Sequence, residues 1–346
     1  MQAVKTSLTR LLGIRVPIVC AAMAGATSPT TALEVTRGGG FGFVGAAFST
    51  PEKLAEDLTF VRDSIPDLGN QPLPIGIGFI GWLLDAKEDV SKQFIDVVLE
   101  NDVRAVWLAF GDDVYRWIEY VRSSPANARA SHKPLIFVQV TSVEEALLAA
   151  KEWKADVIVA QGTEAGGHGG ATTPSTFTLV SEILAALPGD GAPPVLAAGG
   201  MATGLQVAAY LTLGAAGAVL GTRFLLTTEC PYTDAQKAAL LGAKSGSTVR
   251  TMALDYARGT YGWPERLNGR GIRNKIVDEI EAGVPHEIVQ EKYKKGTEAN
   301  DADYMVVWCG QGVSLMNEIK PVKDVMAELH TDIVRQLQKT QGLLDD

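Results

Sequence analysis

The sequence predicts an α/β protein, a (β/α)8 TIM barrel followed by a C-terminal helical subdomain. Eight short apolar runs recur through the first two thirds of the chain, and such runs are typical of strands buried on both faces of a parallel sheet. Most gaps between them show helical periodicity, which is the alternation expected of a barrel. An open doubly wound sheet alternates in the same way. The count of eight, and the glycines after runs six, seven and eight, favour the closed barrel.

The elements follow in a regular order. The eight predicted strands are 17–23, 41–47, 73–80, 105–110, 135–140, 156–162, 194–200 and 215–224. Helical spacing is clearest over 51–64, 142–153 and 203–214, and Thr203 is a hydroxyl residue suited to cap the last of these helices. We therefore assign residues 1–232 to the barrel.

The pattern changes beyond about residue 225. Charged residues become frequent, and helical spacing covers 235–246, 274–284 and 320–338. We expect residues 233–346 to form a helical subdomain packed on the barrel near the active-site mouth. An interaction module is the alternative for the same segment.

Composition restricts the class of protein. The 346 residues are 46% hydrophobic and 21% charged, as in folded globular proteins. The formal charge of −9 has the wrong sign for a general binder of nucleic acid or acidic membranes. Cys20, Cys230 and Cys309 lie far apart, without the paired spacing of a disulfide scaffold or a zinc site. We therefore expect no metal, no nucleic acid and no membrane partner.

Two uncharged stretches, 16–33 and 191–222, are interrupted by glycine, proline or hydroxyl residues and do not resemble membrane helices. The N-terminus has some features of a signal peptide, but Arg15 and Pro17 interrupt its apolar part. A cytoplasmic protein is expected, with an organelle lumen as the alternative, and the oligomeric state is left open.

Two pairs of residues follow strands seven and eight. Gly199 and Gly200 come after the seventh run, and Gly221 and Thr222 come after the eighth. In a barrel these two loops commonly bind phosphate, because unpaired backbone N–H groups converge there and glycine permits close approach. Glycine is also an ordinary turn residue, so only the two pairs together predict a phosphate-bearing ligand.

The segment QGTEAGGHGG (161–170) directly follows the sixth run. Five glycines make poor packing material, so we expect something planar or bulky to rest against the backbone of this segment. His168 then projects into the site, where an imidazole suits proton transfer or anion stabilisation. The alternative is an ordinary surface histidine, which is how we interpret the other three.

Weaker candidates complete the site. Met23 ends the first run and can pack against a ligand ring, or simply in the core. Gly78 is unusual inside a strand and suggests a close approach or a bulge. Gln161 is suited to hydrogen-bond the edge of a heterocycle, and Glu164 either to orient His168 or to cap its loop. Cys230 follows strand eight, but the sequence places no base beside it.

At this point four segments resemble a known family. PIVCAAMAG, QGTEAGGHGG, PVLAAGGMATG and GAVLGTRFLLTTECP look, in order and spacing, like the nitronate monooxygenases, formerly called 2-nitropropane dioxygenases. The strong match covers about 17–232, and a weaker one continues through 266–277 and 308–326. These enzymes are FMN-containing TIM-barrel flavoproteins that use oxygen to convert alkyl nitronates into carbonyl compounds and nitrite.

The resemblance assigns roles to the candidate residues. The FMN phosphate would lie on Gly199, Gly200, Gly221 and Thr222, and the flavin ring near Met23, Gly78, Gln161, Gly166 and Gly167. His168 matches the histidine that stands beside flavin and substrate. It would hold the oxygens of a nitronate or act as a base toward a neutral nitroalkane. The implied partners are thus FMN, a small nitronate and O2.

Two departures from the family pattern concern the surroundings of the flavin ring. Strand five ends with Gln139 where relatives often carry a lysine, so this position offers the flavin no positive charge. Gly78 stands at a position that is polar in some relatives. An NAD(P)H-dependent FMN reductase of a quinone or enoyl substrate is therefore the alternative enzyme. A flavin-free barrel acting on a phosphosugar and a non-enzymatic binding protein are more distant ones.

Overall fold

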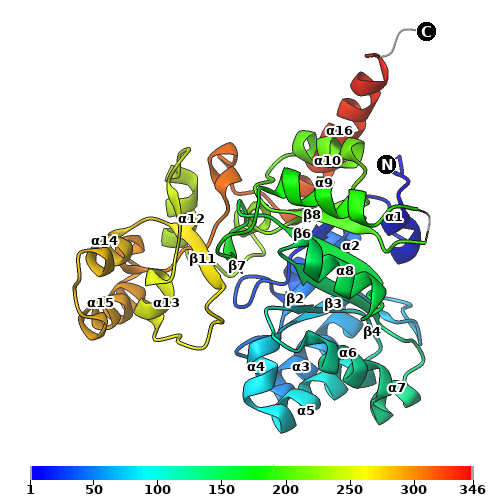
Figure 1. The fold of residues 1–346 in the computed structure, drawn as a ribbon, viewed down its shortest axis with the longest axis horizontal. Coiled ribbons are helices and arrows are strands. Elements are labelled where there is room, and N and C mark those ends of the chain that lie inside the picture. Colours follow the sequence, from blue (N-terminus) through cyan, green and yellow to red (C-terminus); the bar gives the residue numbers. More distant parts are fainter. Residues whose placement is uncertain (1, 190, 344–346) are drawn as a thin grey trace.

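The computed structural model describes residues 2–189 and 191–343, and its centre is a closed parallel barrel (Figure 1). The barrel strands, in their order around the ring, are β1 (Ile18–Cys20), β2 (Phe41–Gly45), β3 (Leu73–Ile80), β4 (Val103–Ala109), β5 (Leu135–Val140), β6 (Val157–Gln161), β8 (Val195–Ala198) and β9 (Gly217–Leu220). Pairing of β1 with β9 closes the ring. All eight predicted strands are confirmed, and so is the closed barrel.

Aromatic side chains fill the barrel interior. The ring of Phe43 lies 5.1 Å from Trp107 and 5.0 Å from Phe137, both in edge contacts. A Cβ added to Gly76 would lie 2.1 Å from the Phe43 ring, so this glycine makes room for the core, and the β3–β4 register shifts just before it. Leu8 of α1 (Ser7–Leu12) joins the same apolar cluster.

Helices surround the barrel. In chain order they are α2 (Pro29–Arg37), α3 (Pro51–Asp63), α4 (Gly81–Ala86), α5 (Glu88–Glu100), α6 (Val114–Ser123), α7 (Pro125–Arg129), α8 (Val143–Lys151), α9 (Thr176–Ala186) and α10 (Gly204–Leu213). Thr203 caps α10, as predicted, and forms a reciprocal capping box with Gln206. The helices predicted at 51–64, 142–153 and 203–214 correspond to α3, α8 and α10.

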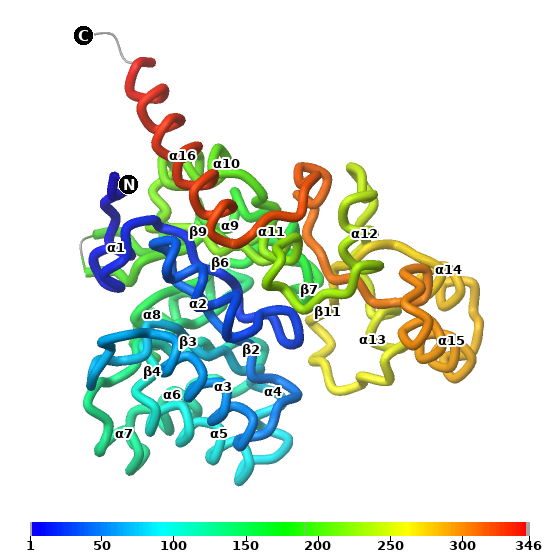
Figure 2. Tube along the Cα trace, turned by 180° about the vertical axis from the view of Figure 1, so that it is seen from behind, coloured from blue at the N-terminus to red at the C-terminus, as the bar shows by residue number. Residues whose placement is uncertain are grey.

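A second lobe stands beside the barrel (Figures 1 and 2). We call residues 233–316 the insertion. It contains α12 (Asp234–Gly242), β10 (Thr248–Thr251), α13 (Ala253–Arg258), β11 (Leu267–Ile272), α14 (Lys275–Glu281), α15 (His286–Ala299) and the 3₁₀ turns η1 (Ala302–Tyr304) and η2 (Gln311–Leu315). The segment is therefore only partly helical. Its strand β11 pairs antiparallel with both β10 and β7 (Gly167–Gly170), which gives a sheet in the order β10–β11–β7.

The glycine-rich segment that we treated as a loop thus contains a strand. Gly269 of β11 is paired with His168, and Arg270 with Gly167. This strand leaves the barrel after β6 and joins the sheet of the insertion. The pairing was not visible in the sequence, because β7 has no apolar alternation and its partner lies about a hundred residues away.

The last helix, α16 (Val322–Gln341), returns to the barrel. It packs on α10 and α2, and its apolar face belongs to the same core as the barrel helices. A Cβ on Gly204 would lie 2.3 Å from the Leu329 carbonyl oxygen, so the helices approach closely. The domain boundary at residue 232 remains a prediction, but these contacts favour assigning α16 to the barrel.

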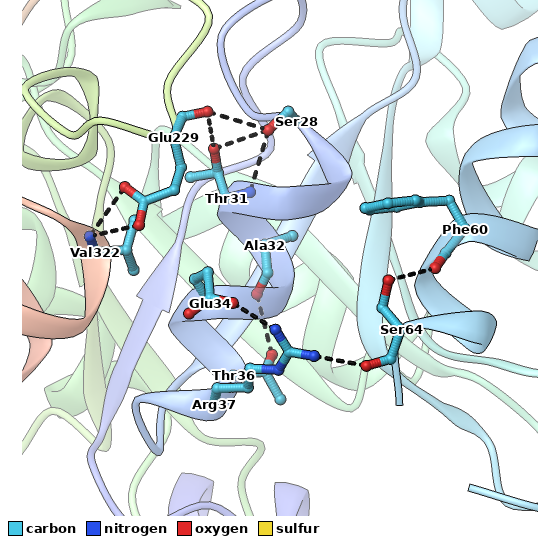
Figure 3. Close-up of polar contacts among 10 residues, drawn as sticks. All are labelled: Ser28, Thr31, Ala32, Glu34, Thr36, Arg37, Phe60, Ser64, Glu229 and Val322. Carbon is cyan, nitrogen blue, oxygen red and sulfur yellow. Dashed lines mark hydrogen bonds and ion pairs between the residues drawn. The ribbon is translucent and has the colours of Figure 1, made fainter. Parts of the chain in front are cut away.

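Glu229 forms hydrogen bonds that attach the start of α16 to the barrel (Figure 3). Both carboxylate oxygens of Glu229 lie 3.0 Å from the backbone N–H of Val322 and accept its hydrogen bond. The backbone oxygen of Glu229 accepts hydrogen bonds from the hydroxyls of Ser28 and Thr31 at the start of α2. Glu229 therefore connects two helix N-termini that lie far apart in the sequence.

Of the helices in the described part of the chain, none combines the length and the apolar composition that a membrane span requires.

Candidate active site

A cavity of about 340 Å³ lies where the carboxyl ends of the barrel strands meet the insertion. This is the face on which barrel enzymes carry their sites, and the volume lies in the range of small-molecule pockets. All ten site residues proposed from the sequence line it, namely Met23, Gly78, Gln161, Gly166, Gly167, His168, Gly199, Gly200, Gly221 and Thr222. The structure thus brings these ten residues into one place, whereas the weaker candidates Glu164 and Cys230 do not line the cavity.

One end of the cavity is built from backbone. Gly199 has a φ of +130° and Gly200 a φ of +71°, so both positions favour glycine. A Cβ on Gly199 would also lie 2.6 Å from the Thr176 hydroxyl. The Thr222 hydroxyl accepts a hydrogen bond of 2.8 Å from the Gly310 N–H, which leaves its own proton for a ligand. Together with Gly221 at the start of α11 (Thr222–Leu225), these groups suit a phosphate.

Two glutamines supply unsatisfied polar atoms at the cavity wall. Gln161 donates from Nε2 to the His168 backbone oxygen at 3.0 Å, while its Oε1 has no partner among the described residues. The Nε2 of Gln139 is likewise buried and unpartnered within the described part of the chain. Such atoms are costly unless a ligand pairs with them. A heterocycle with donor and acceptor edges, such as a flavin, fits this pair.

The remaining candidates shape the cavity through close packing. A Cβ on Gly78 would lie 2.2 Å from the Cβ of Ala22, so β3 needs glycine there to admit the loop after β1. Met23 places its sulfur 3.2 Å from where a Gly221 Cβ would stand. On Gly166 a Cβ would meet the Gly310 nitrogen at 2.4 Å, while a Cβ on Gly167 would meet open space. Gly167 therefore leaves room beside the histidine.

His168 is held by side chains of the insertion. Its Nε2 lies 3.0 and 2.9 Å from the two carboxylate oxygens of Asp255, which belongs to α13 and is fully buried. The Trp263 ring stacks on the imidazole at a centroid distance of 3.5 Å, with only 8° between the planes. Trp308 lies at 4.8 Å in a tilted contact. The imidazole is thus fixed in orientation, and only about a tenth of its side chain is exposed.

The electrostatics of this pair favour a neutral imidazole. Burial lowers the pKa of His168 below its usual value. The hydrogen bond and charge of Asp255 oppose this change, while the charges of Arg258 and Arg250 lower the pKa further. Burial is the largest influence, so His168 is ready to accept a proton near neutral pH.

Two arginines hold the loop that leads to His168. Arg250 donates to the carbonyl oxygens of Thr163 and Ala165 at 3.4 and 3.0 Å, and Arg270 donates to Thr163 at 3.0 Å. Burial lowers the pKa of Arg250 to about 10. Glu164 accepts hydrogen bonds from the N–H and hydroxyl of Thr176 at 2.7 and 2.9 Å. Of our two expectations for Glu164, the loop-holding role is therefore supported by contacts, and the orienting partner of His168 is Asp255.

The cysteines have no features of nucleophiles. Burial raises the pKa of Cys230, and it raises that of Cys309 to about 12, so both remain thiols. Cys309 lines the cavity, whereas the Cys230 sulfur donates to the Ala26 carbonyl oxygen at 3.3 Å. This agrees with the absence of a base beside Cys230 in the sequence.

Sequence analysis missed the residues that surround the imidazole. Asp255 and Trp263 lie beyond the barrel in sequence, within segments without a recognisable motif, and Trp308 begins the weakly similar segment 308–326. The weak resemblance over 266–277 and 308–326 was the one signal that this region takes part in the site. The pairing of β7 with β11 explains why the insertion takes part in the site, because it brings this region next to His168.

Comparisons with known proteins agree with this geometry. The family model described as nitronate monooxygenase matches residues 5–332. A nitronate monooxygenase from Neurospora crassa is 32% identical, over 94% of this chain and 91% of that protein. Nitronate monooxygenase npaC from Metarhizium robertsii is also 32% identical, over 90% and 89% of the two chains.

Two solved structures resemble the whole fold. Nitroalkane oxidase from Streptomyces ansochromogenes has a TM-score of 0.76 and 26% identity, covering 96% of this chain and 99% of that one. FabK from Thermotoga maritima has a TM-score of 0.79 and 27% identity, covering 99% and 100%. With a matching family model over nearly the full length and curated relatives above 30% identity, the chain belongs to the nitronate monooxygenase family.

Proposed function

We propose that this protein is an FMN-dependent oxidoreductase that oxidises alkyl nitronates with O2 to carbonyl compounds and nitrite, with His168 contacting the substrate. The observation that carries the proposal is the joint placement of the glycine-built end, the unpartnered glutamine atoms and His168 in one cavity. Family membership supports the reaction class.

The residues present fit FMN. Gly199, Gly200, Gly221 and Thr222 would hold its phosphate through backbone N–H groups and one hydroxyl. Gln139 and Gln161 would satisfy their buried polar atoms on the ring system. When bound, FMN supplies electron transfer between the organic substrate and oxygen.

The chain's own residues bind and orient the substrate. His168 contacts the substrate and accepts its α-carbon proton when the substrate is a neutral nitroalkane. The aromatic rings of Trp263 and Trp308 exclude water from the imidazole. Arg258 lines the same cavity and brings a positive charge that attracts an anionic nitronate. A mouth formed partly by the insertion therefore suits a small anion.

A second candidate is an NAD(P)H-dependent FMN reductase of a quinone or enoyl substrate. Gln139, which offers a flavin no positive charge at the end of β5, favours it, because one barrel and one phosphate site can serve different reactions.

Anaerobic mixing separates the two candidates. The purified protein should be yellow, and propyl nitronate should bleach its flavin absorbance, while NADH and NADPH should not. Rapid bleaching by either nucleotide would overturn the first proposal in favour of the second. A colourless protein that FMN cannot reconstitute would contradict both and favour a flavin-free barrel.

A further inference from the structure

The hydrogen bond between Asp255 and His168 determines which nitrogen of the neutral imidazole carries the proton. A carboxylate accepts hydrogen bonds and donates none, so Nε2 must carry the proton that Asp255 accepts. In a neutral imidazole the other nitrogen, Nδ1, is then a lone-pair acceptor. Nδ1 makes no hydrogen bond with any described residue, and His168 lines the cavity.

Charged and aromatic side chains surround the pair formed by Asp255 and His168. Asp255 lies in the first turn of α13. The Arg258 guanidinium on the same helix and that of Arg250 on β10 are close enough to influence His168. These two arginines and Asp255 are the charged groups that act on the imidazole, while Trp263 and Trp308 contact it without charge.

We propose that Asp255 is a positioning residue that holds His168 in the tautomer with its proton on Nε2, so that the nitrogen toward the cavity accepts protons. The inference rests on the proposed function in taking His168 as the group that meets the substrate. It adds that the insertion, which carries Asp255, determines what the histidine of the barrel segment can do.

The tautomer affects two forms of substrate differently. A neutral nitroalkane must lose an α-proton: the C–H bond breaks, its electron pair forms the C=N bond of the nitronate with charge on the nitro oxygens, and the proton bonds to Nδ1. A preformed nitronate needs no such step. Loss of Asp255 should therefore reduce turnover of the nitroalkane far more than turnover of its nitronate.

The first measurement locates the ring proton of His168 in the native enzyme itself. Nitrogen-15 NMR of the holoenzyme, labelled at its histidine rings, reports which ring nitrogen carries the proton, and a His168→Gln sample assigns the signal. We expect the proton of His168 on Nε2 in the native enzyme. A proton on Nδ1 would overturn the proposal, whatever the activity.

The second measurement compares Asp255→Asn with the native enzyme, using nitroethane and ethyl nitronate as probes. Asn can donate to Nε2 as well as accept from it, so the tautomer is no longer fixed. We expect kcat on nitroethane to fall by roughly 100-fold or more and kcat on ethyl nitronate by less than about 10-fold, with a mixed tautomer in the NMR spectrum.

Asp96→Asn is the matched control, because Asp96 also accepts two side-chain hydrogen bonds, from Tyr120 and Ser124, but lies on α5 of the barrel exterior. It should retain the native ratio of the two activities. Equal losses on both probes in Asp255→Asn, or an unchanged ratio, would overturn the proposal. If the native enzyme oxidises neither probe while His168 carries its proton on Nε2, the proposed function fails and the positioning role of Asp255 is retained.

Discussion

The two ends of the cavity are built by different means. The end formed by Gly199, Gly200 and Gly221 consists of backbone from consecutive barrel loops, shaped by positive φ angles and close packing. The end around His168 consists of side chains, and its main partners Asp255 and Trp263 come from the insertion. Backbone sites are encoded locally in short glycine motifs, whereas side-chain sites depend on contacts between distant segments. Cofactor binding and reactivity should therefore be separable by mutation.

The largest expected effect comes from His168→Ala. Removing the imidazole should lower turnover of nitroalkanes by roughly 100- to 10,000-fold, the usual contribution of a positioned base. Turnover of nitronates should fall less, because a preformed nitronate needs no proton transfer to His168. FMN content should remain near native, because the loops that we propose to hold its phosphate do not depend on this side chain. Steady-state kinetics and the flavin absorbance per protein measure the two quantities.

His132→Ala is the control for that variant, since His132 lies outside the cavity lining and contacts the Arg104 carbonyl oxygen. If His168→Ala simply empties the flavin site, the two ends are not independent and our assignment of roles is wrong.

Gly199→Ala should have the opposite effect, which is weaker FMN binding with little change in turnover once FMN is bound. A side chain at a φ of +130° that also meets the Thr176 hydroxyl strains the loop, and a strain of about 1–3 kcal/mol corresponds to roughly 5- to 150-fold weaker FMN binding. Fluorescence titration of the apoprotein with FMN measures the change. At saturating FMN, turnover should approach the native value.

Gly242→Ala provides the comparison for this substitution, because a Cβ there meets no atom within 4 Å. A Gly199→Ala protein that binds FMN like the native one would show that this loop does not hold the cofactor.

The pH dependence tests the electrostatics of the side-chain end. His168 accepts a proton only when neutral, and burial lowers its pKa below the usual 6.5. With a nitroalkane as substrate, kcat/KM should therefore keep its neutral-pH value as the pH falls through 6.5. It should decline about tenfold per pH unit only below the lowered pKa of His168. Arg258→Met removes a charge that lowers this pKa, so the decline should begin at higher pH. An unchanged profile in the variant would contradict the influence of Arg258.

The smallest effect is expected outside the cavity. Glu229→Ala removes the acceptor of the Val322 N–H at the start of α16 (Figure 3). We expect a loss of about 1 kcal/mol in unfolding free energy, measured by urea denaturation, with FMN affinity and turnover unchanged. A marked loss of activity would indicate that attachment of α16 also shapes the active site.

The sequence alone determined the barrel and the glycine-rich loops at the carboxyl ends of its strands. Eight apolar runs with glycines at the later strand ends specify local structure, and in a barrel all carboxyl ends meet at one rim, so Gly199 and Thr222 had to lie near Gln161. Residues that follow different strands of a barrel therefore lie close together, even when they are far apart in the sequence.

Only the tertiary structure decided what surrounds the imidazole. The β7–β11 pairing brings His168 to the sheet of the insertion and places Asp255 and Trp263 against it, although neither residue has a motif of its own. The return of α16 to α2 and α10 was equally hidden, since its helical periodicity shows which face is apolar but not which helices cover it. Side-chain partners and helix neighbours depend on long-range packing, and a single sequence does not encode that packing in any local pattern.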